Sequence, residues 1–259
     1  MSADGVSEDA LLGGRLRLKQ PRRGHRFGHD AVLLAAACPA QPGECVVDLG
    51  AGVGAAGLAL AARVPDLVIT LVEIDPELAR LAVDNAKLNG LSERVRVIAL
   101  DVAAPARAFE AAGLFSESAA RVLMNPPFND PLRQRASPDP RRRLAYAGSP
   151  ASLGSWIKCA TRLLRPRGTL TLIWRADGLD EVLGALAHGY GGVSVLPVHP
   201  TPREPAIRVL VSASKASRAP LAVLPGLVLQ DGAGAPTSAA EAVLRGTCDL
   251  LLAAVKSET

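Results

Sequence analysis

The chain has 259 residues, of which 49% are hydrophobic and 21% charged, and its formal net charge is +4. These values indicate a globular protein of one large domain, or of a domain with a small appendage. The mild excess of positive charge permits a polyanionic partner without requiring one. The sequence has neither an apolar run of roughly 18 residues nor a signal-peptide pattern, so we expect a cytoplasmic protein with no membrane partner.

A metal site is not expected. The four cysteines are far apart and form no C-x-x-C pair, and the four histidines have no metal-ligand spacing. Buried thiols in a reducing compartment explain such cysteines best.

Residues 1–44 are predicted to form an N-terminal extension ahead of the main domain. Its first dozen residues are expected to be mobile, as chain ends often are. Strand-like alternation begins at Gly14 and passes into a basic segment. A helix is expected from Asp30, which can serve as its N-cap.

Residues 45–215 are predicted to fold as a doubly wound, mostly parallel α/β sheet. Short apolar runs alternate with helical patterns, which is typical of such a sheet; the runs cover 45–49, 67–73, 94–100, 121–125 and 169–174. The helical pattern before the last run is expected to stop at Arg165 to Gly168. Two more strands, near 192–198 and 206–214, are joined by a short proline-rich loop and should form an antiparallel hairpin, which gives seven strands. Residues 216–259 are expected to pack on the domain as a C-terminal extension, with a helical pattern over 238–255.

A glycine-rich turn follows the first of these strands, in the stretch VVDLGAGVGAAG. Ligands of doubly wound sheets bind at the carboxyl ends of the strands, and glycines there let a ligand approach the backbone. We therefore predict cofactor contacts at Asp48, Gly50, Ala51, Gly52 and Gly54. The pattern Gly52-x-Gly54-x-x-Gly57 also fits a dinucleotide-binding turn, so a nicotinamide cofactor is an alternative.

Acidic residues end the next two strands, and both are predicted to bind the cofactor. Glu73 can accept hydrogen bonds from two ribose hydroxyls, and Asp101 can accept one from an adenine amino group. Their neighbours Ile74 and Val102 belong to the same predicted contacts. A carboxylate at Asp48 would repel a pyrophosphate but would favour a ligand that carries an ammonium and a sulfonium.

Asp75 is predicted to cap a helix rather than to bind a ligand. It directly precedes Pro76, and proline is favoured at the first position of a helix. Asp101 could likewise cap the segment that follows it, so its role in binding has a structural alternative.

The stretch VLMNPPFND, from Val122 to Asp130, ends the fourth strand. An exocyclic aromatic amine is a poor nucleophile because its lone pair is delocalised into the ring. The side-chain oxygen of Asn125 and the carbonyl of Pro126 can accept its two N–H protons and so free the lone pair, while Pro127 restricts the backbone of Pro126. Phe128 can stack on the ring. These four residues are predicted to hold an amine for alkylation.

The glycine turn, Glu73 and Asp101 together resemble the S-adenosylmethionine site of class I methyltransferases, and N-P-P-F resembles the acceptor motif of amino-group methyltransferases. Over most of its length, the chain resembles the bacterial tRNA1(Val) adenine-N6 methyltransferases. This resemblance lies in GHRFGHDAVLLAA, NPPF, residues 155–186 and residues 215–244. It implies S-adenosylmethionine as the cofactor, a tRNA methylated at adenine 37 as the substrate, and Phe27 and Asp30 as further residues on the cofactor side.

An arginine-rich stretch, RQRASPDPRRR, follows the acceptor motif. We predict that Arg141, Arg142 and Arg143 bind RNA phosphates. A solvated run of charges is the alternative. Other acceptors are also possible: guanine N2 in ribosomal RNA, whose enzymes usually carry a second methyltransferase-like half, and glutamine N5 in proteins, whose enzymes carry a helical N-terminal domain.

Overall fold

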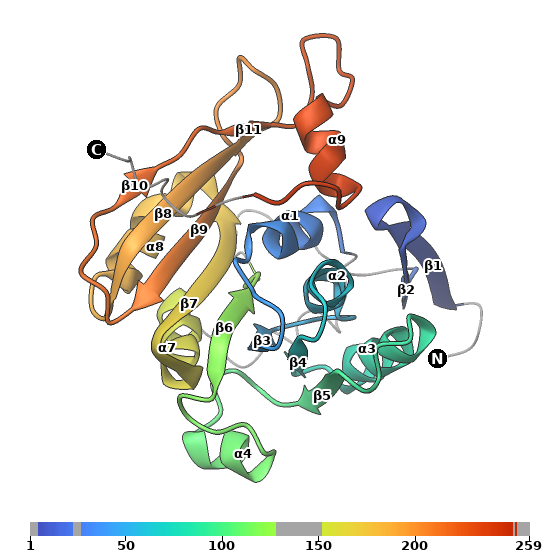
Figure 1. The fold of residues 1–259 in the computed structure, drawn as a ribbon, viewed down its shortest axis with the longest axis vertical. Helices are drawn as coiled ribbons and strands as arrows, with labels where there is room; N and C mark the ends of the chain where they lie inside the picture. Colours follow the sequence, from blue (N-terminus) through green and yellow to red (C-terminus); the bar gives the residue numbers. More distant parts are fainter. Residues whose placement is uncertain (1–4, 23–26, 128–151, 251, 253–259) are drawn as a thin grey trace, which may run out of the picture.

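A nine-stranded sheet runs through the molecule and has helices on both faces (Figure 1). The computed structural model describes residues 5–22, 27–127, 152–250 and 252. The strand order is β10-β8-β9-β7-β6-β3-β4-β5, and β11 also pairs with β8. The strands are β3 (Cys45–Leu49), β4 (Val68–Glu73), β5 (Val95–Ala99), β6 (Ala119–Met124), β7 (Leu164–Arg175), β8 (Tyr190–His199), β9 (Arg208–Lys215), β10 (Ala222–Val223) and β11 (Leu227–Val228).

The pairing directions confirm the predicted architecture. Strands β5, β4, β3, β6 and β7 are parallel to one another, and β9 lies antiparallel between β7 and β8. The seven predicted strands are all present. The short strands β10 and β11 are additions from the C-terminal extension, and both pair in parallel with β8.

The helices form two layers, and each layer closes a separate hydrophobic core. Side chains of α1 (His29–Ala37), α2 (Ala55–Arg63) and α3 (Pro76–Leu88) pack on one face of the sheet. Those of α4 (Ala106–Ala111), α7 (Leu153–Leu163) and α8 (Leu179–Leu186) pack on the other. Two short 3-10 helices, η2 (Leu12–Gly14) and η3 (Ala176–Gly178), complete the connections.

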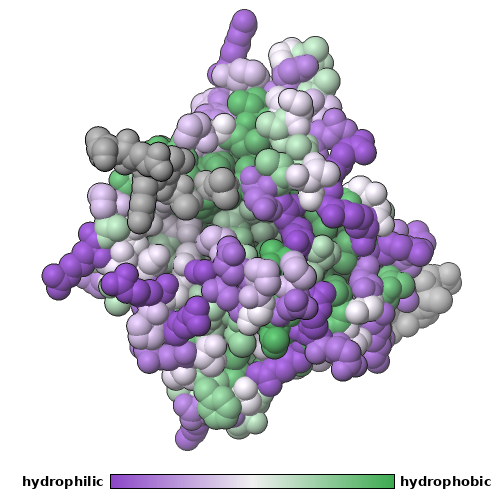
Figure 2. All heavy atoms as spheres, viewed as in Figure 1, coloured by the Kyte–Doolittle hydropathy of each residue, from purple (hydrophilic) through white to green (hydrophobic). Residues whose placement is uncertain are grey.

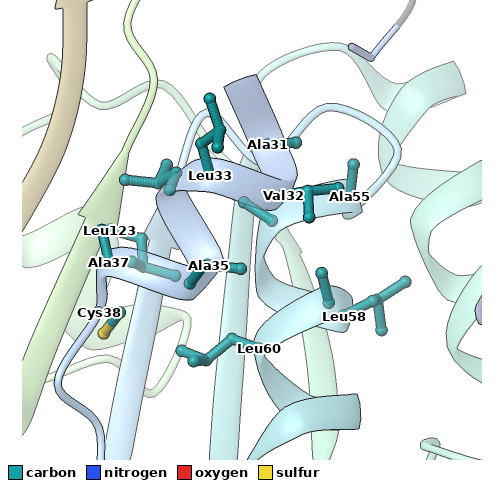
Figure 3. Close-up of a cluster of buried hydrophobic side chains, with 14 of the residues drawn as sticks. Ala31, Val32, Leu33, Ala35, Ala37, Cys38, Ala55, Leu58, Leu60 and Leu123 are labelled. Carbon is teal, nitrogen blue, oxygen red and sulfur yellow. The ribbon is translucent and has the colours of Figure 1, made fainter. Parts of the chain in front are cut away.

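Helix α1 lies between other elements of the fold, so its apolar side chains are buried on every side of the helix. Every residue from Ala31 to Ala37 is buried. Figure 3 shows its side chains facing Ala55, Leu58 and Leu60 of α2 and Leu123 of β6. The last helix, α9 (Ser238–Leu244), packs against α1 as well. On the face drawn in Figure 2, hydrophilic side chains are spread along the outline of the molecule.

The N-terminal segment is ordered, so the expectation that the first dozen residues are mobile is wrong for residues 5 onward. Strands β1 (Val6–Leu11) and β2 (Leu16–Pro21) form an antiparallel hairpin. Leu16 and Leu18 are fully buried in the core that α1, α2 and α3 share. Packing against the body of the protein therefore outweighs the usual mobility of a chain end.

Two predicted helix ends also differ from the structure. Helix α7 ends at Leu163, because Leu164 already pairs with Ala119 of β6. The expected helix over 238–255 ends at Leu244. Gly246 there has a φ of +70°, a left-handed conformation that stops a helix. In the described part of the chain, none of the helices is long and apolar enough to cross a membrane.

Candidate functional site

Three of the predicted site residues lie side by side at the carboxyl edge of the sheet. Leu49 of β3 pairs with Val72 of β4 on one side and with Met124 of β6 on the other. The residues that follow these three are Gly50, Glu73 and Asn125, so the strand register brings them to the same level on three adjacent strands. The sheet itself therefore joins the glycine turn to the start of the acceptor motif.

The glycine turn between β3 and α2 is tied to β4. The backbone N–H of Gly52 donates to Oε2 of Glu73 at 2.7 Å, and that of Ala51 donates to the carbonyl of Val72 at 3.0 Å. The N–H of Gly54 closes the turn on the carbonyl of Ala51 at 2.8 Å. These bonds fix the backbone of the turn beside the end of β4.

The space in front of the turn is open, which fits a bound cofactor. A Cβ added to Gly52 would meet no atom of the described residues within 4 Å, although the φ of +58° favours glycine at this position. At Gly50 and Gly57, in contrast, a Cβ would collide with Trp156 of α7 and Leu71 of β4. Gly52 therefore leaves room for a ligand, whereas the other two glycines leave room for protein side chains.

Asp48 supports the turn from inside the protein. Its side chain is 2% exposed, and Oδ2 accepts a hydrogen bond from the N–H of Gly57 at 2.9 Å. Burial raises the pKa of this carboxyl to about 7, against the opposing effect of the Gly57 bond. The carboxylate of Asp48 was predicted to favour a positively charged ligand, but in the structure it points beneath the first turn of α2. A direct contact between Asp48 and the cofactor stays a prediction.

Glu73 is held in a single orientation at the end of β4. Besides the Gly52 bond, its Oε1 accepts from the N–H of Asp75 at 2.9 Å. Burial raises the pKa of Glu73, and the backbone N–H donors oppose that rise. Carboxylate oxygens have roughly four acceptor positions in total, so acceptor capacity remains for ribose hydroxyls.

Asp75 caps a helix, as predicted. Its Oδ1 accepts from the N–H groups of Glu77 and Leu78 at the start of α3, and Pro76 occupies the first helical turn.

The remaining predicted contacts on this side are Asp101 and two apolar residues, Ile74 after Glu73 and Val102 after Asp101. Asp101 is exposed, and its Oδ1 accepts from the N–H of Ala103 at 2.8 Å, which closes a turn but does not cap α4. Ile74 is 60% exposed, an unusual position for a large apolar side chain, whereas Val102 is buried. Ile74 thus offers an accessible apolar surface beside the two acids.

Asn125 lies directly after β6 and is half-buried, Pro126 is buried and Pro127 is exposed. The side chain of Asn125 makes no hydrogen bond with the described part of the chain, so its oxygen is available to a substrate. Phe128 and Arg141, Arg142 and Arg143 lie outside the described residues.

The two N-terminal candidates are anchored by neighbours. The N–H of Phe27 donates to Oε1 of Gln20 in β2 at 3.1 Å. Oδ2 of Asp30 accepts from Nε of Arg208, at the start of β9, at 2.9 Å. Asp30 is not the N-cap of α1 as expected; that position is Gly28, and Asp30 lies in the first helical turn.

Two residues that contact the glycine turn were not among the predicted site residues. The ring of Trp156 lies on Gly50, and the scarcity of aromatics, 3% of the chain, was a signal for it. Asn85 in α3 donates to the carbonyl of Val53 at 2.9 Å. Its signal was a polar residue on the apolar face of that helix. Among the residues that the structure describes, there is also no cluster of side chains suited to a metal ion.

Comparisons with known proteins agree with this geometry. The methyltransferase small domain family matches residues 26–185. A tRNA1(Val) (adenine(37)-N6)-methyltransferase from Erwinia tasmaniensis is 31% identical over 73% of this chain and 75% of its own length.

Solved structures agree as well. A predicted O-methyltransferase from Agrobacterium tumefaciens is 32% identical and has a TM-score of 0.73. The match covers 86% of this chain and 98% of the other. The M. jannaschii protein TYW2, solved in complex with AdoMet, is 16% identical and shares the fold, with a TM-score of 0.55 over 81% of this chain and 85% of its own. The chain therefore belongs to the methyltransferase small domain family and is an S-adenosylmethionine-dependent methyltransferase.

Proposed function

We propose that this methyltransferase acts on the exocyclic N6 amino group of adenine 37 in a tRNA. The observation that carries the proposal is the strand register, which sets Asn125 beside Gly50 across β3 and β6. The side chain of Asn125 makes no hydrogen bond within the described residues, so its oxygen can accept one from a substrate. The relatives named for this reaction support the choice of acceptor.

The cofactor is proposed to lie along the carboxyl ends of β3, β4 and β5. When bound, S-adenosylmethionine supplies a methyl group on a positively charged sulfur. Glu73 would accept from the ribose hydroxyls and Asp101 from the adenine amino group, with Ile74 and Val102 beside the ring. The turn that contains Gly50, Ala51, Gly52 and Gly54 lies over Asp48 and would contact the rest of the cofactor. Phe27 and Asp30 would contact the cofactor from the N-terminal segment.

The acceptor amine is proposed to lie between two oxygen atoms of the acceptor motif. Oδ1 of Asn125 and the carbonyl of Pro126 would each accept one N–H proton of the target nitrogen. These bonds draw the nitrogen toward tetrahedral geometry, so that its lone pair points at the methyl group. They also stabilise the positive charge that develops on the nitrogen during attack. Phe128 would stack on the base.

Two acceptor oxygens favour an amine over a hydroxyl as the methylated group. A hydroxyl has one proton and would leave one of the two oxygens without a donor, which is costly where water is excluded. We therefore favour N-methylation, although the Agrobacterium tumefaciens protein is described as an O-methyltransferase.

A tRNA substrate also requires contacts to phosphates. We propose that Arg141, Arg142 and Arg143 supply them from the segment that follows the acceptor motif, because arginine pairs well with phosphate oxygens. Such a substrate would place the enzyme in the cytoplasm.

The proposal is tested by methyl transfer from radiolabelled S-adenosylmethionine to total tRNA from a strain that lacks this enzyme, followed by nucleoside analysis. We expect label in N6-methyladenosine, and the Asn125→Ala variant serves as the negative control. Parallel reactions offer ribosomal RNA and protein from the same strain. Label in N2-methylguanosine, or label in ribosomal RNA or protein with none in tRNA, would contradict the proposed acceptor. Each of those results would identify one of the other amine classes.

A further inference from the structure

A fully buried asparagine links the N-terminal hairpin to the glycine turn. Asn85 of α3 is 0% exposed. Its Nδ2 donates to the carbonyls of Val53 and Lys19, both at 2.9 Å, and its Oδ1 accepts from the N–H of Lys19 at 2.7 Å. We propose that Asn85 is a positioning residue: anchored on β2, it holds the Gly52–Gly54 turn in the shape that the cofactor needs.

The turn depends on such bonds because it is rich in glycine. Gly52 and Gly54 have φ values of +58° and +88°, and glycine backbones adopt many other conformations at little cost. The N–H of Gly52 is held by Glu73 on one side of the turn. The carbonyl of the next residue, Val53, is held by Asn85 on the other. Together the two side chains fix the Ala51–Gly52 and Val53–Gly54 peptide groups, which lie on either side of the Gly52–Val53 peptide group.

The neighbouring Asn89 shows which part of this arrangement is specific to Asn85. One helical turn later, Asn89 contacts β2 in the same way: Oδ1 accepts from the N–H of Arg17 at 2.9 Å, and Nδ2 donates to its carbonyl at 2.7 Å. Its remaining contact is the carbonyl of Asn85 at 2.8 Å, within the same helix. Both asparagines therefore attach the hairpin to α3, and only Asn85 reaches the glycine turn.

The hairpin also orients a second segment on the cofactor side. Gln20 of β2 is 2% exposed, and its Oε1 accepts from the N–H of Phe27. Its Nε2 donates to Oδ2 of Asp9 in β1 at 2.7 Å. Figure 1 shows the hairpin beside α3, and its strand β2 contacts both α3 and α2. The hairpin is thus linked to two predicted parts of the cofactor site: to the glycine turn through Asn85 of α3, and to Phe27 through its own Gln20.

The test compares Asn85→Ala with Asn89→Ala in the full chain. Hydrogen exchange of peptides that cover 51–57 is measured without cofactor, relative to peptides from β7, and the Kd for S-adenosylmethionine is measured by calorimetry. Asn85→Ala should speed exchange in the turn and raise the Kd about tenfold, the effect of roughly one hydrogen bond. Asn89→Ala should leave both quantities within about twofold of the wild type, since it makes no contact with the turn.

Equal effects of the two substitutions would overturn the proposal, because attachment of the hairpin alone would then explain them. Unchanged exchange in 51–57, or an unchanged Kd, in Asn85→Ala would overturn it too. If Asn85→Ala does not fold, Asn85→Ser is measured in the same way, since its shorter hydroxyl cannot bond β2 and the turn together. The inference rests on the proposed cofactor position. Neither hydrogen exchange nor the Kd measurement contains a methyl acceptor, so a failure of this inference can be told apart from a failure of the tRNA methylation test.

Discussion

The proposed cofactor side and the proposed acceptor side of the sheet edge differ in how their polar groups are satisfied. On the cofactor side, Glu73 and Asp48 accept from backbone N–H groups of the glycine turn and α2, and Asn85 donates to the turn. On the acceptor side, Asn125 makes no side-chain hydrogen bond to any part of the chain that the structure describes. Within the described residues, the polar groups of the proposed cofactor side are thus already bonded to one another, whereas the side chain of Asn125 is not.

This difference has a chemical reason. A cofactor that every turnover requires is bound best by groups that need no rearrangement, because ordering costs reduce affinity. An acceptor oxygen, in contrast, contributes to rate only if it bonds to the reacting amine more strongly in the transition state. The oxygen of Asn125, which is not bonded within the described residues, can form such a bond, whereas one already bonded within the protein would first have to break that bond.

The largest effect is expected for Asn125→Ala. Removing one of two groups that stabilise developing charge should lower kcat by about 10³-fold. The Kd for S-adenosylmethionine should stay within about threefold, because Asn125 takes no part in the bonds that hold the glycine turn. Single-turnover rates measure the loss of activity, and calorimetry on the same preparation measures the Kd for S-adenosylmethionine. Asn125→Asp, which keeps an oxygen of similar reach, should retain more activity than Asn125→Ala.

The opposite pattern is expected for Glu73→Ala. Loss of the carboxylate removes both the bond to Gly52 and the proposed ribose contacts, so the Kd for S-adenosylmethionine should rise about 10²-fold. The rate at saturating cofactor should fall much less. The matched control is Glu77→Ala, which alters an exposed carboxylate in the first turn of α3. If Glu73→Ala and Glu77→Ala had the same Kd, the cofactor would not lie over Glu73.

A smaller effect concerns stability, and it tests the burial of Asp48. Its pKa is raised to about 7, mainly by burial, from the usual value of 3.8. Between these two pH values the folded protein keeps a proton that the unfolded chain releases, so the free energy of unfolding falls as pH rises from about 4 to about 7. Asp48→Asn cannot titrate and should reduce this fall by on the order of 2–4 kcal/mol.

Denaturant unfolding at pH 4.5 and pH 8 measures that difference. Asp180→Asn, which changes an exposed carboxyl of α8, is the control and should leave the wild-type pH dependence in place. If Asp48→Asn kept the same pH dependence as the wild type, Asp48 would not be the buried proton-binding group described above.

Much of the architecture followed from pattern alone. The runs at 45–49 and 67–73 are apolar because both faces of their strands are covered, and parallel strands with two covered faces produce just such runs. The positions of Gly50, Glu73 and Asn125 at strand ends were equally predictable, since carboxyl ends of parallel strands share one edge.

What the sequence did not reveal depends on contacts between distant segments. Whether Asp48 faces the crevice or α2 depends on the space that Gly57 leaves beside it. The hairpin at the N-terminus is stabilised by α3 residues more than sixty positions away, through Asn85 and Asn89. Local propensity contains no information on such partners.

The most direct test of the account is a crystal structure with S-adenosylhomocysteine and adenosine monophosphate bound. We predict that the sulfur of the first ligand lies in front of Gly52, and that N6 of the second lies within about 3 Å of both Oδ1 of Asn125 and the carbonyl of Pro126. An adenine bound away from Asn125, or a sulfur on the far side of β4 from the glycine turn, would contradict the claim that the two half-sites meet across β3 and β6.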